Sequence, residues 1–224
     1  MFSFDSLEPS LRSKCNMLLE LVISSPHNLT SVRIFERAVT VHLEDTLIPF
    51  ANSTLTGSYV DIGSGGGIPG LLLAAVFPKS CWVLLDSIAK KTQEIERFAL
   101  KMKLSNVTVK TARAEEFALE ERASFDSAFL RAVARSDISM ELAAPLVKIG
   151  GSIVLYKGPG WNEERRFARI AEERLGLSLS QEKEYRLSDG STRFLVVYEK
   201  EVETPPEFPR RVGMASKSPL GGSK

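Results

Sequence analysis

The pattern of hydrophobic and polar positions changes character once along the chain. Before Gly57, apolar residues recur at helical spacing over residues 7–23 and 32–47, and the breaker Ser24-Ser25-Pro26 separates the two stretches. After Gly57, short apolar runs alternate with amphipathic segments, as is typical of a parallel sheet wound with helices. The pattern therefore predicts an N-terminal helical cap followed by an α/β unit.

The second part contains seven segments that read as strands. Five short apolar runs predict parallel strands over residues 59–62, 82–86, 107–110, 127–130 and 152–156. Helices are expected over 69–77, 89–103, 138–147 and 162–175, with Gly150 and Gly151 ending the third of these. Segments 177–187 and 192–199 flank Ser188-Asp189-Gly190-Ser191, which predicts an antiparallel hairpin.

The strongest chemical signal is the run Asp-Ile-Gly-Ser-Gly-Gly-Gly-Ile-Pro-Gly over residues 61–70, after the first predicted strand. Its glycines allow the backbone to turn tightly and to approach an adenosine-bearing ligand. A dinucleotide site requires Gly or Ala where Ile68 stands, and a P-loop requires a Gly-Lys-Ser/Thr that does not follow. What remains is similar to the first motif of S-adenosylmethionine-dependent methyltransferases. The alternative is a glycine-rich turn that holds no ligand.

This motif and the strand pattern together predict a Rossmann-like class I methyltransferase, an α/β fold. We expect a seven-stranded, mostly parallel sheet with an antiparallel C-terminal hairpin and an N-terminal helical cap. Three parts are predicted: the cap over residues 1–56, the S-adenosylmethionine-binding domain over 57–200, and a basic tail over 201–224. The tail is rich in Pro, Gly and Ser, so we expect it to be mobile in isolation.

Composition excludes several classes of protein. With 224 residues, 43% of them hydrophobic, the chain fits one globular unit of ordinary core size. The two cysteines, Cys15 and Cys81, lie far apart, so neither a disulfide framework nor a metal cluster is predicted. No apolar stretch approaches a membrane span, and we expect a cytoplasmic protein without a membrane partner. The net charge of +1 means that any nucleic acid must be bound by local patches.

Polar residues after the second and third strands complete the predicted cofactor site. Asp86 ends the second strand at the spacing expected for a carboxylate that binds the ribose hydroxyls, although Asp86 and Ser87 also suit a helix cap. Ala114 and Glu115 follow the third strand, where a side chain meets the adenine edge; the alternative for Glu115 is a solvated helical position. The predicted cofactor-binding residues are Asp61, Gly63, Gly65, Gly67, Ile68, Asp86, Ala114, Glu115 and Arg131.

Basic residues at the carboxyl edge of the sheet and in the tail are the predicted substrate contacts. Arg131 follows the fourth strand, where a guanidinium binds a carboxylate or phosphate through two hydrogen bonds. Lys157 follows the fifth strand and is either a phosphate contact or a solvated residue. Arg210 and Arg211 are either a flexible arm laid along RNA or a solubilising tail.

An ordered set of motifs resembles the bacterial small-subunit ribosomal RNA methyltransferase G family, also called glucose-inhibited division protein B. The motifs are Asn28-Leu29-Thr30, His42 with Asp45, the glycine run, Leu84-Leu85-Asp86-Ser87, Arg113-Ala114-Glu115, Arg131-Ala132-Val133-Ala134, Lys157-Gly158 and Phe208-Pro209-Arg210-Arg211. The resemblance implies methylation of N7 of a guanine in 16S rRNA of the small ribosomal subunit, with S-adenosylmethionine as cofactor. It also implies that His42 faces the site, bonded to Asp45 or to RNA.

The motifs leave two other functions open. One is a methyltransferase for another RNA or a small molecule, and the other is a non-catalytic cofactor-binding module of ribosome assembly. Guanine N7 carries an in-plane lone pair at neutral pH, so attack needs alignment rather than a general base. No catalytic residue is therefore predicted, and His42 is assigned no proton transfer. The sequence does not reveal the oligomeric state or the residues that hold the guanine.

Overall fold

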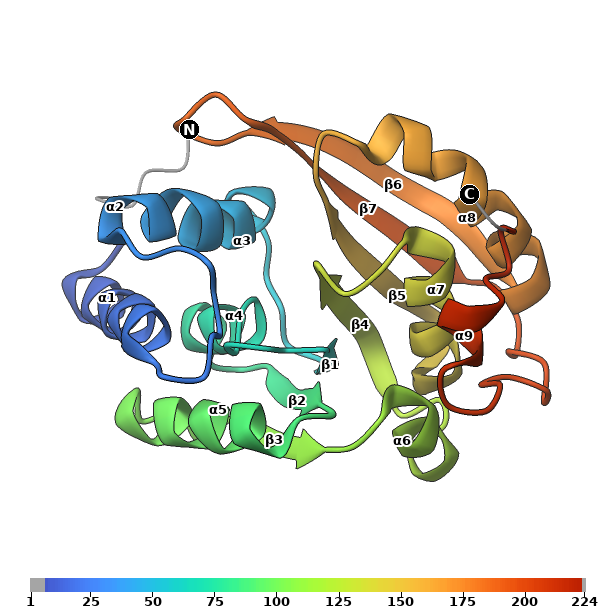
Figure 1. Cartoon of the computed structure of the whole chain (residues 1–224), viewed down its shortest axis with the longest axis horizontal. Helices are drawn as coiled ribbons and strands as arrows, with labels where there is room; N and C mark the ends of the chain where they lie inside the picture. The colour runs from blue at the N-terminus through green and yellow to red at the C-terminus, as the bar shows by residue number, and fades with distance from the viewer. Residues whose placement is uncertain (1–6, 223–224) are drawn as a thin grey trace.

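The computed structural model describes residues 7–222, which fold around one seven-stranded sheet (Figure 1). The strands are β1 (Ser58–Ile62), β2 (Cys81–Asp86), β3 (Val107–Thr111), β4 (Phe125–Arg131), β5 (Val147–Lys157), β6 (Leu177–Arg186) and β7 (Thr192–Lys200). Their order is β3-β2-β1-β4-β5-β7-β6, with the first five parallel and β7 antiparallel to both neighbours. This confirms the predicted mostly parallel sheet with its C-terminal hairpin.

Helices cover both faces of the sheet, α1 to α5 on one side and α6 to α9 on the other (Figure 1). The first group is α1 (Pro9–Ser24), α2 (Phe35–Ala38), the π-helical turn η2 (Val39–Glu44), α3 (Asp45–Leu47), the 3-10 turn η3 (Ile48–Phe50), α4 (Gly70–Val76) and α5 (Ala89–Lys101). The second is α6 (Ala114–Glu120), α7 (Ser136–Ala143) with the 3-10 turn η4 (Ala144–Leu146), α8 (Trp161–Leu175) and α9 (Met214–Lys217). Each face therefore has its own apolar core.

The N-terminal helices belong to the first of these cores. In α1, Cys15, Leu18, Leu19 and Val22 are buried at helical spacing, and they join a cluster with residues of α4, β2 and α5. The division of the chain into cap, domain and tail stays a prediction. Within residues 7–222, no helix is long and apolar enough to cross a membrane.

The predicted helix ending at Gly150 and Gly151 is wrong at its C-terminal end. The helix stops at Ala143, η4 ends at Leu146, and both glycines lie inside β5. A Cβ on Gly151 would lie 2.6 Å from the carbonyl oxygen of Asp126, beside the register shift between β4 and β5. These glycines therefore permit close backbone approach between two strands and do not cap a helix.

The expectation of a mobile tail is also wrong for the part of the chain that the structure describes. Phe208 is fully buried in the core beneath α7 and α8, and the Arg122 guanidinium donates to its carbonyl oxygen. Gly221 donates its backbone N–H to Asp137 on α7. The described part of the tail therefore packs along the face that carries α6 to α8, with Gly221 held against α7.

Candidate functional site

The glycine run forms a tight turn between β1 and α4. The backbone N–H groups of Gly63 and Ser64 both donate to the carbonyl oxygen of Leu85, which ties the turn to the end of β2. Gly63, Gly65 and Gly67 have φ values of 70°, 56° and 81°, a region that L side chains rarely adopt. A Cβ on Gly63 would lie 2.9 Å from Val133, so only glycine fits this turn against the segment after β4.

Asp61 supports this turn from beneath. Its side chain is almost fully buried, and Oδ2 accepts the N–H of Gly70 at 3.0 Å while Oδ1 has no hydrogen-bond partner among the described residues. Burial raises the pKa of Asp61 to about 7, against the opposing effect of the Gly70 hydrogen bond. The carboxylate thus fixes the start of α4, and its predicted contact with a cofactor stays a prediction.

A pocket of about 370 Å³ opens in front of the turn, and we call it the glycine-turn pocket. Predicted site residues in its wall are Gly63, Asp86, Ala114 and Glu115. Apolar side chains of Leu85, Ile88, Ala112, Val133, Ile138 and Leu142 complete much of the lining. The Asp86 carboxylate beside an apolar slot of this volume suits a ribose joined to a flat base. Gly65, Gly67, Ile68 and Arg131 do not line this pocket.

Asp86 joins the glycine turn to α5. Its Oδ2 accepts the N–H of Gly65 at 3.0 Å and its Oδ1 accepts the N–H of Ile88 at 2.9 Å, just before α5 begins. The bond to Ile88 orders the residues just before α5, but it is not a helix cap, because the N-cap residue of α5 is Ile88 and no side chain caps this helix. A carboxylate has about four acceptor sites, so Asp86 keeps capacity for the predicted ribose hydroxyls. Glu115, by contrast, accepts the N–H of Gly213, and this contact brings the tail to the rim of the pocket.

Arg131 lies at the end of β4 as predicted, but the N-terminal helices surround it. Its guanidinium donates to the carbonyl oxygen of Val41 at 3.0 Å, to Asp45 at 3.1 Å and to Nδ1 of His42 at 3.0 Å. Tyr185 in turn donates its hydroxyl to Asp45 at 2.9 Å. Asp45 is therefore the central acceptor of this cluster.

His42 is bonded to Arg131 and not to Asp45. Burial and the Arg131 charge lower the pKa of His42 to about 3. The neutral ring accepts from Arg131 at Nδ1, so Nε2–H is the donor to the hydroxyl of Thr30 at 2.9 Å. His42 lies in the π-helical turn η2, a rare conformation that often occurs at functional sites.

Arg131 and His42 form the floor of a pocket of about 560 Å³, which we call the arginine pocket. The rest of the lining is residues 30–34, which include Arg33, together with Arg37, Val41 and Ala132. Three guanidinium groups and two hydroxyl-bearing residues, Thr30 and Ser31, therefore meet in one hollow. Such a set of donors suits phosphate oxygens.

Lys157 is buried and paired instead of solvated. Its ammonium donates to Glu164 at 2.7 Å and to the carbonyl oxygen of Ala134 at 3.1 Å, while Ser136 N–H donates to the same Glu164 oxygen. These bonds fix the segment after β4 against the first turn of α8. Sequence reasoning overlooked Glu164, because nothing in α8 marks one glutamate among its many charges.

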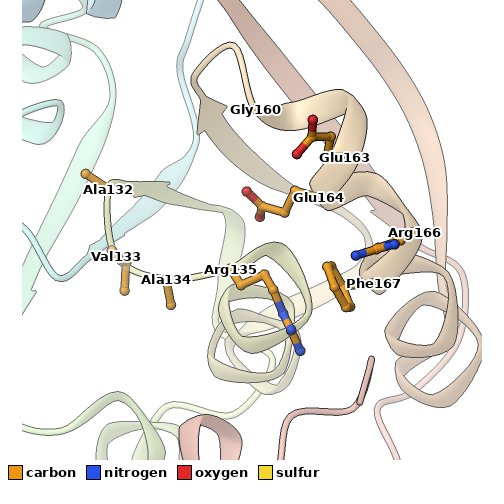
Figure 2. Close-up of a pocket in the computed structure, with 9 residues that line it drawn as sticks. All are labelled: Ala132, Val133, Ala134, Arg135, Gly160, Glu163, Glu164, Arg166 and Phe167. Carbon is orange, nitrogen blue, oxygen red and sulfur yellow. The ribbon is translucent and has the colours of Figure 1, made fainter. Parts of the chain in front are cut away.

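Between these two elements lies a pocket of about 640 Å³, the α8 pocket (Figure 2). Figure 2 shows Glu164 projecting from the first turn of α8 toward the segment 132–135, Glu163 on the same turn near Gly160, and Arg135 beside the ring of Phe167. The Arg135 guanidinium lies 3.9 Å from the ring centroid of Phe167. Ala132, Val133 and Ala134 line both this pocket and the glycine-turn pocket.

The two tail arginines differ. Arg210 makes a two-bond ion pair with Glu141 of α7 and also donates to the carbonyl oxygen of Ser218. Arg211 is exposed. The predicted flexible arm is thus wrong for Arg210, whose side chain anchors the tail, and RNA contacts by either arginine stay a prediction.

Comparison with known proteins gives the family. The family model described as rRNA small subunit methyltransferase G matches residues 11–188. The chain belongs to this family. The ribosomal RNA small subunit methyltransferase G of Thermotoga neapolitana is 42% identical over 213 residues, covering 95% of this chain and 93% of the relative. That of Fervidobacterium nodosum is 40% identical and covers 90% of this chain and 95% of the relative.

Solved structures agree on the fold. The M. jannaschii protein TYW2, solved in complex with AdoMet, has a TM-score of 0.55 at 16% identity, covering 71% of this chain and 76% of that one. Precorrin-6y C5,15-methyltransferase from Geobacter metallireducens has a TM-score of 0.52 at 16% identity, covering 79% and 93%. At this identity the likeness confirms the Rossmann-like methyltransferase fold, and membership of the G family rests on the sequence match.

Proposed function

We propose that this protein methylates N7 of a guanine in 16S rRNA of the small ribosomal subunit, with S-adenosylmethionine as methyl donor. The observation that carries the proposal is the match of residues 11–188 to the rRNA small subunit methyltransferase G family. Relatives of that name cover most of the chain and are themselves covered almost end to end.

The glycine-turn pocket fits the cofactor. Asp86 is the group for the ribose hydroxyls, and the apolar walls with Ala114 accept the adenine. The positive φ of Gly63, which lines the pocket, lets the backbone approach the ligand where a Cβ would intrude. These residues are the ones that would hold S-adenosylmethionine.

Methylation at N7 requires the protein to position the guanine against the methyl donor and does not require proton transfer. The bound cofactor supplies a methyl group that bonds to the N7 lone pair while the carbon–sulfur bond breaks and leaves its electron pair on sulfur. No proton leaves N7, so the reaction needs neither a general acid nor a general base. The neutral His42 ring, with both nitrogens hydrogen-bonded, is therefore assigned no proton transfer. Lys157 and Glu164 position the segment 132–134, which is the wall shared by the cofactor and the α8 pocket.

The proposed location and binding partner follow from the proposed substrate. Its place is the cytoplasm, where small subunits are assembled, and its partner is the subunit itself. The arginine pocket and the exposed Arg211 are the groups suited to the RNA backbone. Lys157 is already paired, so any phosphate it binds shares its ammonium with Glu164.

Labelled S-adenosylmethionine offered with unmethylated small subunits, free 16S rRNA and a small-molecule extract tests the proposal. We expect label in the RNA, and nucleoside digests that place it on N7 of guanine. Label on a ribose or an exocyclic amine overturns the N7 assignment, and label confined to small molecules overturns the RNA substrate. Cofactor binding without label in any pool overturns the enzymatic function.

A further inference from the structure

The α8 pocket lies against the glycine-turn pocket, and the two share one wall. Ala132, Val133 and Ala134 line both of them. A group held in the α8 pocket therefore lies next to whatever the glycine-turn pocket holds. Ala132 has φ +55°, an uncommon conformation for a residue with a Cβ, and such strain is concentrated at functional sites.

One carboxylate in the α8 pocket has no partner. Glu164 is engaged by Lys157, and Arg135 pairs with Asp137 while it stacks on Phe167. Glu163 is exposed, and within residues 7–222 its side chain makes no hydrogen bond or ion pair. It stands beside Gly160 and projects into the hollow, as Figure 2 shows. The pocket thus has fixed walls and one free acceptor group.

We infer that the α8 pocket receives the target guanine and that Glu163 binds its N1–H and N2 amino group. The inference rests on the proposed function. The Watson–Crick edge of guanine carries two adjacent donors, which the two oxygens of one carboxylate accept in parallel, whereas adenine presents an acceptor at N1. N7 lies on the opposite side of the purine, so a base held at Glu163 turns N7 toward the wall shared with the cofactor.

The other pocket that touches Ala132 is less suited to the base. The arginine pocket offers Arg33, Arg37 and Arg131, all donors, and guanine donors find no carboxylate in its lining. Its chemistry matches the phosphates on either side of the target nucleotide. The guanidinium groups of Arg135 and Arg166 lie over the Phe167 ring in this pocket, 3.9 and 4.7 Å from its centroid, and a base extruded from the RNA can stack on a guanidinium plane.

The charge change of the reaction gives Glu163 a role beyond binding. Methylation at N7 turns a neutral base into a cation, and the positive charge makes N1–H and the N2 amino group stronger donors. Their hydrogen bonds to the Glu163 carboxylate therefore strengthen as the reaction proceeds. Loss of this carboxylate should lower kcat as well as raise KM.

The test uses small subunits reconstituted with 16S rRNA that carries guanosine or inosine at the methylated position. Inosine keeps N7 and N1–H but lacks the N2 amino group. We expect inosine to lower kcat/KM of the wild-type protein about tenfold or more. Glu163→Gln should lower kcat/KM for guanosine by about 10- to 100-fold and reduce the guanosine-to-inosine ratio to below about threefold.

Glu173→Gln is the matched control, because Glu173 is an exposed glutamate in the last turn of the same helix. It should behave as wild type, and binding of S-adenosylhomocysteine, measured by calorimetry, should be equal in all three proteins. An unchanged guanosine-to-inosine ratio in Glu163→Gln overturns the inference, as does weaker S-adenosylhomocysteine binding by this variant alone. Failure of the proposed function is distinguishable, because wild-type digests would then contain no 7-methylguanosine.

Discussion

Burial shifts the pKa of two titratable side chains at the carboxyl edge of the sheet, Asp61 and His42. It raises the pKa of Asp61 to about 7 and, together with the charge of Arg131, lowers the pKa of His42 to about 3. Both effects disfavour the charged form in a poorly solvated place. Both groups have structural roles. Asp61 accepts the backbone N–H of Gly70, and His42 is hydrogen-bonded to both Thr30 and Arg131.

The low pKa of His42 makes stability depend on pH. Its pKa of about 3 in the folded protein lies below the ordinary value of 6.5, so the unfolded chain binds more protons between these two values. The contribution of His42 to the free energy of unfolding should therefore fall as the pH is lowered from about 6.5 toward 3, by at most about 1.4 kcal/mol per pH unit, whereas the raised pKa of Asp61 acts in the opposite direction between 3.8 and about 7. Urea denaturation at a series of pH values measures this slope.

His42→Gln should have a shallower slope than wild type in the same window, whereas His27→Gln should keep the wild-type slope because His27 is exposed. Equal slopes for wild type and His42→Gln would show that His42 is charged in the folded protein.

Two elements far apart in sequence, α7 and the C-terminal tail, are joined by one ion pair. The Arg210 guanidinium donates two hydrogen bonds to Glu141, whose side chain is 2% exposed. The hydrogen bond raises the pKa of Arg210. Neighbouring links run from Arg122 to the carbonyl oxygen of Phe208 and from Gly221 to Asp137. The tail therefore depends on α7 for its position.

Arg210→Ala should destabilise the protein by about 3–5 kcal/mol, because it leaves a buried carboxylate without its partner. Arg210→Lys should destabilise the protein less than Arg210→Ala does, since the positive charge remains.

Arg211→Ala should change stability by less than about 0.5 kcal/mol and instead lower the salt dependence of subunit binding by about one unit of slope. Chemical denaturation and binding at several salt concentrations separate the two. Equal loss of stability in both alanine variants contradicts the assignment.

The elements themselves were predictable, and their long-range partners were not. Five apolar runs and the hairpin signature at residues 188–191 located all seven strands, and Asp86, the carboxylate that ends the second strand, lies in the pocket wall as predicted. The pairing of Arg210 with Glu141 joins residues 69 positions apart, and the pairing of Arg131 with Asp45 joins residues 86 positions apart. Local periodicity carries no information on such contacts. The prediction that Gly151 ends a helix was wrong for a related reason, because this glycine permits close approach to Asp126 on another strand.

Across the whole molecule, the sheet separates two apolar cores that share its strands. One contains Trp82 of β2 and the other Trp161 of α8, each 1% exposed. The same strands contribute to both, since Tyr59 packs in one core and Val60 in the other. The two cores should therefore unfold together.

The two tryptophans are the only ones in the chain, so Trp82→Phe and Trp161→Phe each leave a single fluorescent reporter in one core. In each variant, urea unfolding followed by fluorescence should coincide with unfolding followed by far-ultraviolet circular dichroism. A fluorescence transition that precedes the circular dichroism transition in one variant only would reveal a separately folding layer.

The contact between the tail and the glycine-turn pocket has a consequence for the order of events during synthesis. The pocket is lined by residues from Ile62 to Ser216, and Gly213 closes its rim through Glu115. A growing chain can form the glycine turn when α4 and β2 have emerged, but the part of the pocket wall that contains Gly213 and Ser216 is added only after about 130 more residues. Full affinity for the methyl donor should therefore need the segment 213–216, and a nascent chain stalled before residue 213 should bind the methyl donor more weakly than the longer chain.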